Sequence, residues 1–504
     1  MADAGHPRRA AAPAEAAVAT LPAGGPGAPA GDAGTSGGAS GGSIGQARLI
    51  RGLGLWDATL LTIGSIVGTG IFLTTSNMAR VLPHPGLILL VWLVGGLLTL
   101  AGALTYAELG VMFPRAGGQY QYLKEAYGPL WGFLFGWACF AVMMTAGHAA
   151  LGVGFGEYLG GFFPFFSTGH VLLAVPLGRW TWALSGGQLA AVLAIVGLTA
   201  INHVGLRAGA AVQNALTAIK LAAMLAMIVF GLMAPARAAV AATAPAPASG
   251  GGLLAAFGVA MIAAMWTYDG WYGLTGMAGE VRDPGRTLPR GLIAGTGIVI
   301  VLYMLLNVVY LRALSIGELA QNPRVAEAAA AALFGPGAAR LISLAVLVST
   351  FGCLSASLLY TSRFYQPMAE DGLFFRSLAT VHPRYRTPVA SLWAQGVWAS
   401  VLALSGTYEQ LYTCAVFALV VFHALTAVAV IVLRRRRPEL ARPYRTWGYP
   451  VVPLLFVAGC LLLVGNTLVE KPVESLFGSG LLLLGLPAYA LFRARNRRGG
   501  AAGG

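Results

Sequence analysis

The sequence predicts an all-α polytopic membrane protein with about twelve transmembrane helices. Two observations lead to this prediction. Hydrophobic residues make up 57% of the 504 residues and charged residues only 10%, whereas a soluble domain carries about 25% charged residues. The apolar residues also gather in segments of about 20 residues, which is the length that a helix needs to cross a bilayer.

The apolar segments follow one another along most of the chain. Residues 1–48 precede them, are rich in Ala, Gly, Pro and Ser, and lack the apolar core of a signal peptide. We expect this stretch to be a disordered cytoplasmic tail. The expected spans are 55–82, 86–112, 130–160, 185–203, 209–234, 253–279, 289–313, 340–365, 387–405, 410–433, 451–470 and 476–493.

The positive charges predict the orientation of these spans. The formal net charge is +14, and 24 of the 32 Lys and Arg residues fall in segments that are cytoplasmic if the N-terminus is cytoplasmic. This asymmetry predicts that both termini lie on the cytoplasmic side of a plasma membrane, which we expect to be the inner membrane of a bacterial cell. The densest cluster, Arg434 to Arg437 with Arg442 and Arg445, is typical of an anchor against anionic lipid rather than of a nucleic-acid site.

Glycine interrupts two of the spans near mid-membrane, at 64–72 and at 266–273. Backbone cannot face lipid unpaired, and paired interruptions in two halves point to the binding site of a secondary transporter. The arrangement predicts two five-helix repeats of inverted topology at 49–234 and 235–434. The remaining segment, 435–504, then holds two peripheral helices and a cytoplasmic tail.

The loops and cysteines add two expectations. Cys139, Cys353, Cys414 and Cys460 all fall inside spans without metal-ligand spacing, which indicates buried free thiols and no metal site. Among the longer external segments, 161–184 and 314–339, the second contains an alanine-rich stretch at 324–333 that favours a short helix. This helix would be either a lid or a plain connection.

Several motifs resemble the amino acid–polyamine–organocation superfamily of permeases, and in particular bacterial relatives of the L-type amino-acid transporters. They are the opening span 53–72, Tyr106-Ala107-Glu108-Leu109, Phe113-Pro114-Arg115-Ala116-Gly117-Gly118, Tyr268-Asp269-Gly270-Trp271, and the stretches 280–289 and 442–450. The resemblance covers about residues 50–490. It implies the leucine-transporter-like inverted repeat, in agreement with the paired breaks.

The interrupted spans suit an amino-acid zwitterion. Unwinding after Ile66 creates a helix N-terminus near Gly70, where free N–H groups and the positive dipole end attract a carboxylate. Free carbonyls at both breaks attract the ammonium group, and Trp266 corresponds by resemblance to an aromatic gate that leans toward small neutral substrates. The expected substrate-binding residues are Ser65, Ile66, Gly68, Thr69, Gly70, Trp266, Thr267 and Asp269.

Lys220 lies about eleven residues into the fifth span, so its ammonium group is near mid-membrane, where a charge usually serves a function. By resemblance it takes the place of a bound sodium ion, which implies sodium-independent transport. We expect it to bridge the first span near Gly64 and the eighth span near Ser355 or Ser357. The sequence leaves open whether Lys220 exchanges protons or stays charged.

Other polar residues in or beside the spans have two readings each. Asp269 either tunes the amine site or caps a half-helix, and His148 either lines the pocket or packs in the bundle. Glu108, Glu280 and Arg286 form either an inner gate of ion pairs or a solvated cluster at the interface.

The sequence therefore predicts a secondary amino-acid transporter that works by alternating access, without enzymatic chemistry or a cofactor. Exchange of small neutral amino acids and proton symport both remain open. A cationic amino-acid or polyamine carrier and a transporter-like sensor are the alternatives. Amino acid, protons and membrane lipid are the expected partners. No disulfide-linked heavy chain is expected, because the loop at 161–184 has no cysteine.

Overall fold

Helices form most of the chain in the computed structural model, which describes residues 52–115, 117–177, 180–204, 207–237, 252–362, 364–380, 382 and 387–501. The predicted tail at 1–48 lies outside the described residues. The α-helices are α1 (Leu55–Ile66), α2 (Gly70–Val81), α3 (Pro85–Met112), α4 (Gln119–Tyr127), α5 (Pro129–Ala138), α6 (Met144–Gly160), α7 (Gly186–Val204), α8 (Arg207–Met233), α9 (Gly252–Thr267), α10 (Gly273–Gly276), α11 (Pro284–Ala313), α12 (Ile316–Gln321), α13 (Val325–Phe334), α14 (Pro336–Thr361), α15 (Tyr365–Glu370), α16 (Val389–Ser405), α17 (Tyr408–Arg436), α18 (Val451–Glu470), α19 (Pro472–Leu483) and α20 (Gly485–Ala501). A π-helical turn, η1 (Cys139–Met143), joins α5 to α6, and η2 (Pro164–Phe166), η3 (Ala278–Glu280) and η4 (Arg376–Ala379) are 3-10 turns.

The apolar helices agree with the predicted spans, and the all-α polytopic fold class is confirmed. Among the described residues, eight helices or helix pairs are long and apolar enough to cross a membrane, and nine if the bent pair α1–α2 is one span. The other three predicted spans coincide with shorter apolar helices, at Thr217–Met233 in α8, in α9 and in α16. The expected helix near 324–333 is present as α13.

The segment 161–184, which was expected only to be an external loop, contains two strands. β1 (Val171–Leu177) and β2 (Trp180–Ser185) pair antiparallel, with Val175 opposite Trp182, and an irregularity follows Val171. The run 171–177 is rich in Val and Leu, which favours a strand as well as a helix. Its length is too short to span the membrane as a helix.

The first interrupted span bends by 42° between α1 and α2. In the second, α9 ends at Thr267, Gly270 takes a φ of +96°, and only the four-residue helix α10 follows before η3. Glycine accepts this positive φ without a steric cost, so Gly270 lets the chain turn where the helix stops.

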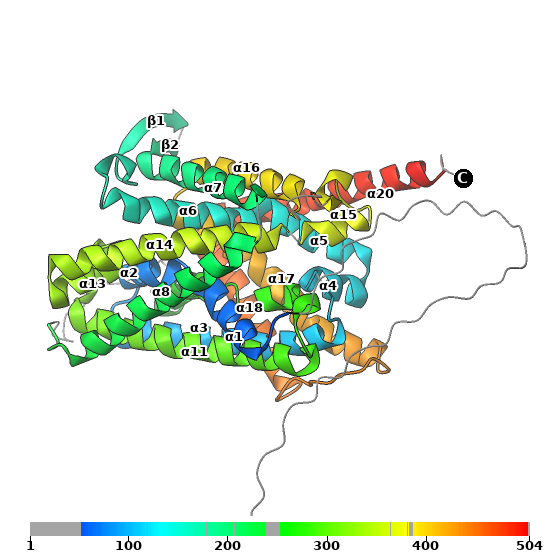
Figure 1. Ribbon diagram of the computed structural model, residues 1–504, viewed down its shortest axis with the longest axis horizontal. Coiled ribbons are helices and arrows are strands. Elements are labelled where there is room, and N and C mark those ends of the chain that lie inside the picture. The colour runs from blue at the N-terminus through cyan, green and yellow to red at the C-terminus, as the bar shows by residue number, and fades with distance from the viewer. Residues whose placement is uncertain are drawn as a thin grey trace, which may run out of the picture. The chain divides into compact units, whose positions relative to one another are not determined.

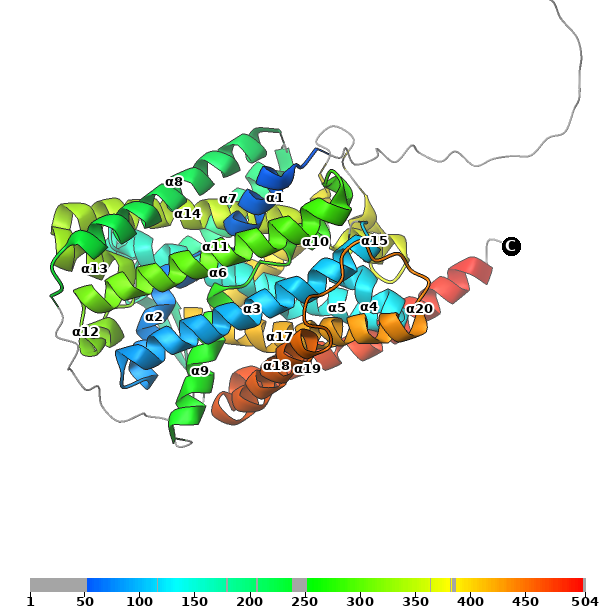
Figure 2. The ribbon, with the colours of Figure 1, turned by 90° about the horizontal axis from the view of Figure 1, so that it is seen from below.

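The helices form two layers with the breaks between them. Figure 1 shows α6, α7, α14 and α16 in one layer, and α1, α3 and α11 in the other. The helices α18, α19 and α20 lie at one edge of the molecule (Figure 2). In the most apolar part of α18 only 28% of the residues are buried, and in that of Pro472–Arg495 only 17%. The corresponding share in α17 is 72%. The last two spans are therefore peripheral, whereas the division into two inverted repeats stays a prediction.

Candidate functional site

A cavity of about 360 Å³ lies between the two layers and reaches from the breaks to the start of α1. This volume falls in the range of small-molecule sites. All eight residues that the sequence predicts for substrate binding line it. Its opposite wall comes from the end of η1, from α6 and from α14, and includes Met143, Met144, Gly147, Leu151 and Cys353.

The two breaks lie against each other at the closed end of the cavity. The hydroxyl of Ser65 donates to the carbonyl of Gly270 at 3.0 Å, and a Cβ atom at Gly270 would lie 2.4 Å from the Ser65 carbonyl oxygen. On the other side of the crossing, a Cβ atom at Gly70 would lie 2.5 Å from the hydroxyl of Thr267. Glycine at both positions is what allows the broken helices to meet.

Tyr303 on α11 joins both breaks. Its buried hydroxyl lies 3.2 Å from the carbonyl oxygen of Ile66 and 3.3 Å from that of Thr267. These two carbonyls were expected to face an ammonium group, and each keeps one further lone pair for such a donor. Tyr303 was not predicted from the sequence, because a single tyrosine in an apolar span carries no motif.

Lys220 lies behind the first break rather than in the cavity wall. Its ammonium group donates to the carbonyl of Gly64 at 2.9 Å and to that of Val67 at 2.7 Å, and the residue is 2% exposed. A buried ammonium group needs such acceptors, since an unpaired charge in a low-dielectric interior is costly. The contact near Gly64 is as expected.

The expected bridge from Lys220 to the eighth span takes another form. The side-chain amide of Asn202 on α7 donates to the backbone carbonyl of Ser355 at 3.0 Å and accepts from the Ser355 hydroxyl at 3.3 Å, and Ser357 bonds to His148 at 2.9 Å. Hydrogen bonds from Lys220 go to the α1 backbone instead, because the helix end there offers free carbonyls. Ser355 and Ser357 still line the cavity.

His148 lies one layer behind the cavity surface. It is 1% exposed, and its Nε2 atom faces the hydroxyls of Ser357 and Thr361 at 2.9 and 3.5 Å. Its Nδ1 atom is buried without a partner. Of the two readings, the structure favours a packing residue behind the wall.

The N-terminus of α2 faces the cavity at Gly68, Thr69 and Gly70. Thr69 precedes the helix, but its side chain does not cap it. Its hydroxyl lies 3.3 Å from that of Tyr408 on α17 instead. The positive end of the helix dipole therefore points at the cavity without a side-chain oxygen in front of it.

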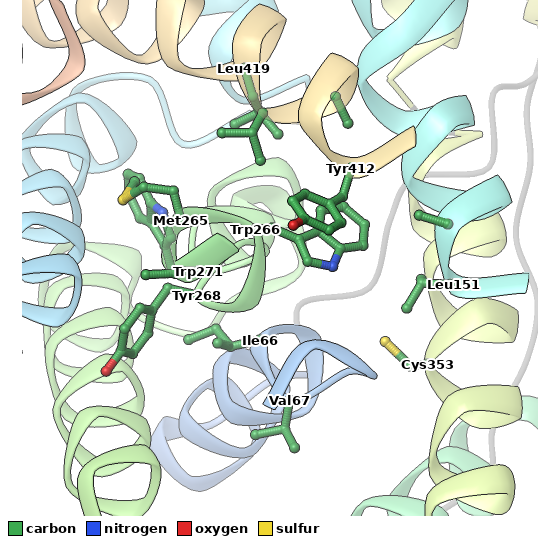
Figure 3. Close-up of a cluster of buried hydrophobic side chains, with 14 of the residues drawn as sticks. Ile66, Val67, Leu151, Met265, Trp266, Tyr268, Trp271, Cys353, Tyr412 and Leu419 are labelled. Carbon is green, nitrogen blue, oxygen red and sulfur yellow. The ribbon is translucent and has the colours of Figure 1, made fainter. Parts of the chain in front are cut away.

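Aromatic side chains close the cavity on the side away from the start of α1. The Trp266 indole donates to the hydroxyl of Tyr408 at 2.9 Å and stacks on Tyr412, with ring centroids 6.0 Å apart and an interplanar angle of 18°. Figure 3 shows Trp266 beside Tyr412, with Leu151 and Cys353 on the far wall. Tyr412 is tied in turn to Asn77 at 2.9 Å.

Glu108 does not take part in the expected inner gate. It is fully buried and accepts two 2.7 Å hydrogen bonds from Arg434, together with two from Thr446, at 2.8 and 2.9 Å. The prediction that grouped Glu108 with Glu280 and Arg286 is therefore wrong for Glu108. Its position four residues before the end of α3 lets the end of α17 reach it.

Glu280 and Arg286 lie nearer the mouth of the cavity. Glu280 lines the cavity, and its backbone carbonyl accepts hydrogen bonds from the amides of Gly52 and Leu53 at 3.0 and 3.1 Å. Arg286 is exposed in the first turn of α11 and does not line the cavity. The start of α1 is thus tied to the segment that follows α10.

This arrangement, in which two broken helices meet at a cavity inside a helical membrane protein, is the architecture of a secondary transporter. The amino acid permease family model matches residues 53–486, and the chain belongs to this family. It is 32% identical to the serine/threonine exchanger SteT of Bacillus subtilis over 89% of this chain and 98% of the relative. It is 31% identical to the human b(0,+)-type amino acid transporter 1, over 88% of each. It is 30% identical to the human large neutral amino acids transporter small subunit 2, over 89% of this chain and 81% of the relative.

Proposed function

We propose that this protein is a sodium-independent exchanger of small neutral amino acids that works by alternating access. The observation that carries the proposal is the meeting of the two breaks at the closed end of the cavity. There the N-terminus of α2 and the carbonyls of both interrupted helices face the same space. A zwitterion requires such a pairing of anion-binding and cation-binding backbone groups at short separation.

The carboxylate of the substrate would bind at Gly68, Thr69 and Gly70, where the dipole of α2 is uncapped. The ammonium group would bind backbone carbonyls at the ends of the two interrupted helices, α1 and α9. The carbonyl-bearing residues that line the cavity there are Ser65, Ile66, Trp266, Thr267 and Asp269.

The wall that would face the substrate side chain favours small neutral groups. Trp266 packs over Gly147, where a Cβ atom would lie 3.6 Å from the indole ring, and the thioethers of Met143 and Met144 lie beside it. These side chains are apolar and offer no charge to a charged substrate side chain. The relative named a serine/threonine exchanger fits the same substrate class.

Lys220 supports independence from sodium. Its ammonium group already supplies a positive charge to the carbonyls of Gly64 and Val67. A sodium ion at these oxygens would meet a like charge at close range. Exchange needs no other coupling ion, because the return of the empty carrier is replaced by the return of a loaded one.

The structure has its cavity open toward the start of α1 and closed by Trp266 on the other side. With the predicted orientation, this is an inward-facing conformation. Closure of the inner mouth would involve the start of α1 and the segment after α10 together, since their backbones are hydrogen-bonded.

Cationic amino acids are the second candidate substrates, and one observation favours them. Asp269 lines the site, and its Oδ1 atom is buried and has no hydrogen-bond partner. A cationic side chain or a proton at Asp269 would satisfy this atom. The fold alone does not restrict a protein to one substrate class.

Proteoliposome uptake tests the proposal. A panel of labelled neutral and cationic amino acids is offered with and without unlabelled substrate inside, with and without sodium, and with an inward proton gradient. Uptake of small neutral substrates only into loaded vesicles, unaffected by sodium, is the expected result. Gradient-driven uptake into empty vesicles would replace exchange with proton symport, and preference for lysine or arginine would favour the second candidate.

We also propose that the protein works without a disulfide-linked subunit. Its four cysteines are all buried and free, and the external segment 161–184 has none. Electrophoresis of purified native membranes with and without reductant tests this. A band that shifts on reduction would contradict it.

A further inference from the structure

The third span contains a π-helical turn, η1, directly before the cavity wall. The widened turn closes with a hydrogen bond from the amide of Met144 to the carbonyl of Cys139. Such turns are rare, and they appear often at functional sites because they shift the side chains that follow. Here the residues at the end of the turn and just after it, Met143 and Met144, line the cavity.

Two side chains donate hydrogen bonds to the carbonyls of this turn. The hydroxyl of Thr145 donates to the carbonyl of Phe140 at 2.9 Å. The indole of Trp398, on the neighbouring helix α16, donates to the carbonyl of Ala141 at 2.9 Å. Irregular backbone at membrane depth persists only where such donors satisfy it.

Trp398 itself lies outside the wall of the cavity. It is half-buried at the contact of α16 with η1 and does not line the cavity, whereas Met143 and Met144 do. Met144 also reaches the second break, since its sulfur lies 3.9 Å from the hydroxyl of Tyr272. The turn η1 therefore connects the indole donor of Trp398, outside the cavity, to Met143 and Met144 in the cavity wall.

We propose that Trp398 is a positioning residue for substrate selectivity, which holds η1 through the Ala141 carbonyl so that Met143 and Met144 keep the side-chain end of the cavity narrow. This inference rests on the proposed function. Without the indole donor, the turn can relax toward a regular helix. The relaxation rotates the two thioethers and widens the space that a larger substrate side chain needs.

The test compares Trp398→Phe with the wild type in proteoliposomes. Phenylalanine keeps an aromatic ring in the helix contact but removes the N–H donor. The ratio of transport efficiency for serine to that for leucine is measured from Vmax and KM of each. We expect this ratio to fall about tenfold, at the lower end of the roughly 10- to 200-fold that one methylene group contributes to selectivity.

Trp393→Phe is the matched control. Trp393 lies on the same helix and also donates through its indole, but to His203 at 3.2 Å, away from η1. We expect its serine-to-leucine ratio to equal that of the wild type. Thr145→Val, which removes the donor to Phe140, should shift the ratio in the same direction as Trp398→Phe and serves if Trp398→Phe fails to fold.

An unchanged ratio in both Trp398→Phe and Thr145→Val, with transport of both substrates reduced in equal proportion, would overturn the inference. That result would leave Trp398 as a packing residue only. A wild-type protein that transports neither substrate would instead overturn the proposed function, and this inference with it.

Discussion

The ammonium group of Lys220 lies 2.7 Å from the carbonyl oxygen of Val67, the residue at which α1 stops. A helix end leaves carbonyls without partners, and in a membrane these groups need donors from elsewhere in the protein. Lys220 supplies one such donor to Val67 and another to Gly64. The charge on α8 is therefore joined to the conformation of the break on which the proposed site is built.

Replacing this lysine should disable transport. In Lys220→Met the side chain keeps its length but loses the donors to both carbonyls. Hydrogen bonds to charged groups contribute about 1.5–3 kcal/mol each, so we expect the initial exchange rate to fall about tenfold or more. The measurement is uptake at acidic and at neutral pH, with and without sodium.

Lys471→Met is the control for that experiment. Lys471 pairs with Glu409 at 2.8 Å, and both side chains are about a third exposed. Such a pair contributes about 0–1 kcal/mol, so transport should be preserved. Wild-type rates in Lys220→Met at every pH would show that the lysine has no part in transport.

The contact between Gly70 and Thr267 predicts the effect of a single methyl group. In Gly70→Ala, the new Cβ atom would lie 2.5 Å from the Thr267 hydroxyl and 2.9 Å from its Cα atom, so the breaks must separate. We expect substrate affinity to fall at least about tenfold, since displacing a binding group by 1 Å can cost a hundredfold. The measurement is substrate-induced thermal stabilisation of the purified protein.

Gly297→Ala, in the middle of α11, has open space around the new atom and should behave like the wild type. Equal affinity in both variants would contradict the assignment of Gly70 to the carboxylate site.

The sequence predicted the parts of the fold that depend on local composition. Long apolar segments specify the spans, and glycine inside a span marks the breaks at 64–72 and 266–273, because both signals are contained in a few neighbouring residues. The hairpin at 171–185 was missed, since seven apolar residues do not distinguish a strand from a short helix.

Contacts between distant residues were predicted less well. Lys220 was expected to bridge α1 near Gly64 and α14, but both of its hydrogen bonds go to carbonyls at the end of α1, whose availability depends on where the helix stops. Glu108 was grouped with Glu280 and Arg286 from their positions at the ends of spans, whereas its partner Arg434 lies 326 positions away in the chain. Tyr303 was not considered, because its role follows only from the approach of both breaks to one hydroxyl.

The Glu108–Arg434 pair predicts a loss of stability rather than of gating. Arg434→Met leaves a fully buried carboxylate with the Thr446 donors and with Arg442, whose Nε atom lies 3.7 Å from it. The cost therefore stays below the roughly 3–5 kcal/mol of a buried charge that has lost its only partner. We expect Arg434→Met to have a lower melting temperature in detergent than the wild type. The measurement is size-exclusion chromatography after heating.

Arg437→Met is the control, because Arg437 lies three residues after Arg434 and forms an exposed pair with Glu439. Loss of this pair should lower the free energy of unfolding by only about 0–1 kcal/mol. A normal melting temperature for Arg434→Met combined with altered exchange kinetics would instead return Glu108 to the inner gate.

The bonds of Tyr408 predict how the outer side opens. Tyr408→Phe removes the hydroxyl that bonds both Trp266 and Thr69. Each bond contributes about 0.5–1.5 kcal/mol net, so their loss should raise the fraction of outward-open molecules about tenfold. Cys353 reports this fraction, because it lines the cavity and we expect a reagent from outside to reach it only when Trp266 moves away.

The measurement is the labelling rate of Cys353 by a membrane-impermeant maleimide added outside, with Cys139, Cys414 and Cys460 replaced by alanine. Tyr127→Phe is the control, since the hydroxyl of Tyr127 bonds the carbonyl of Leu425 at 2.8 Å and contacts no residue of the closed side. Faster labelling in Tyr408→Phe alone identifies its hydroxyl as part of the closure over Trp266. Equal labelling in both variants would mean that stacking on Tyr412 holds the outer side closed without it.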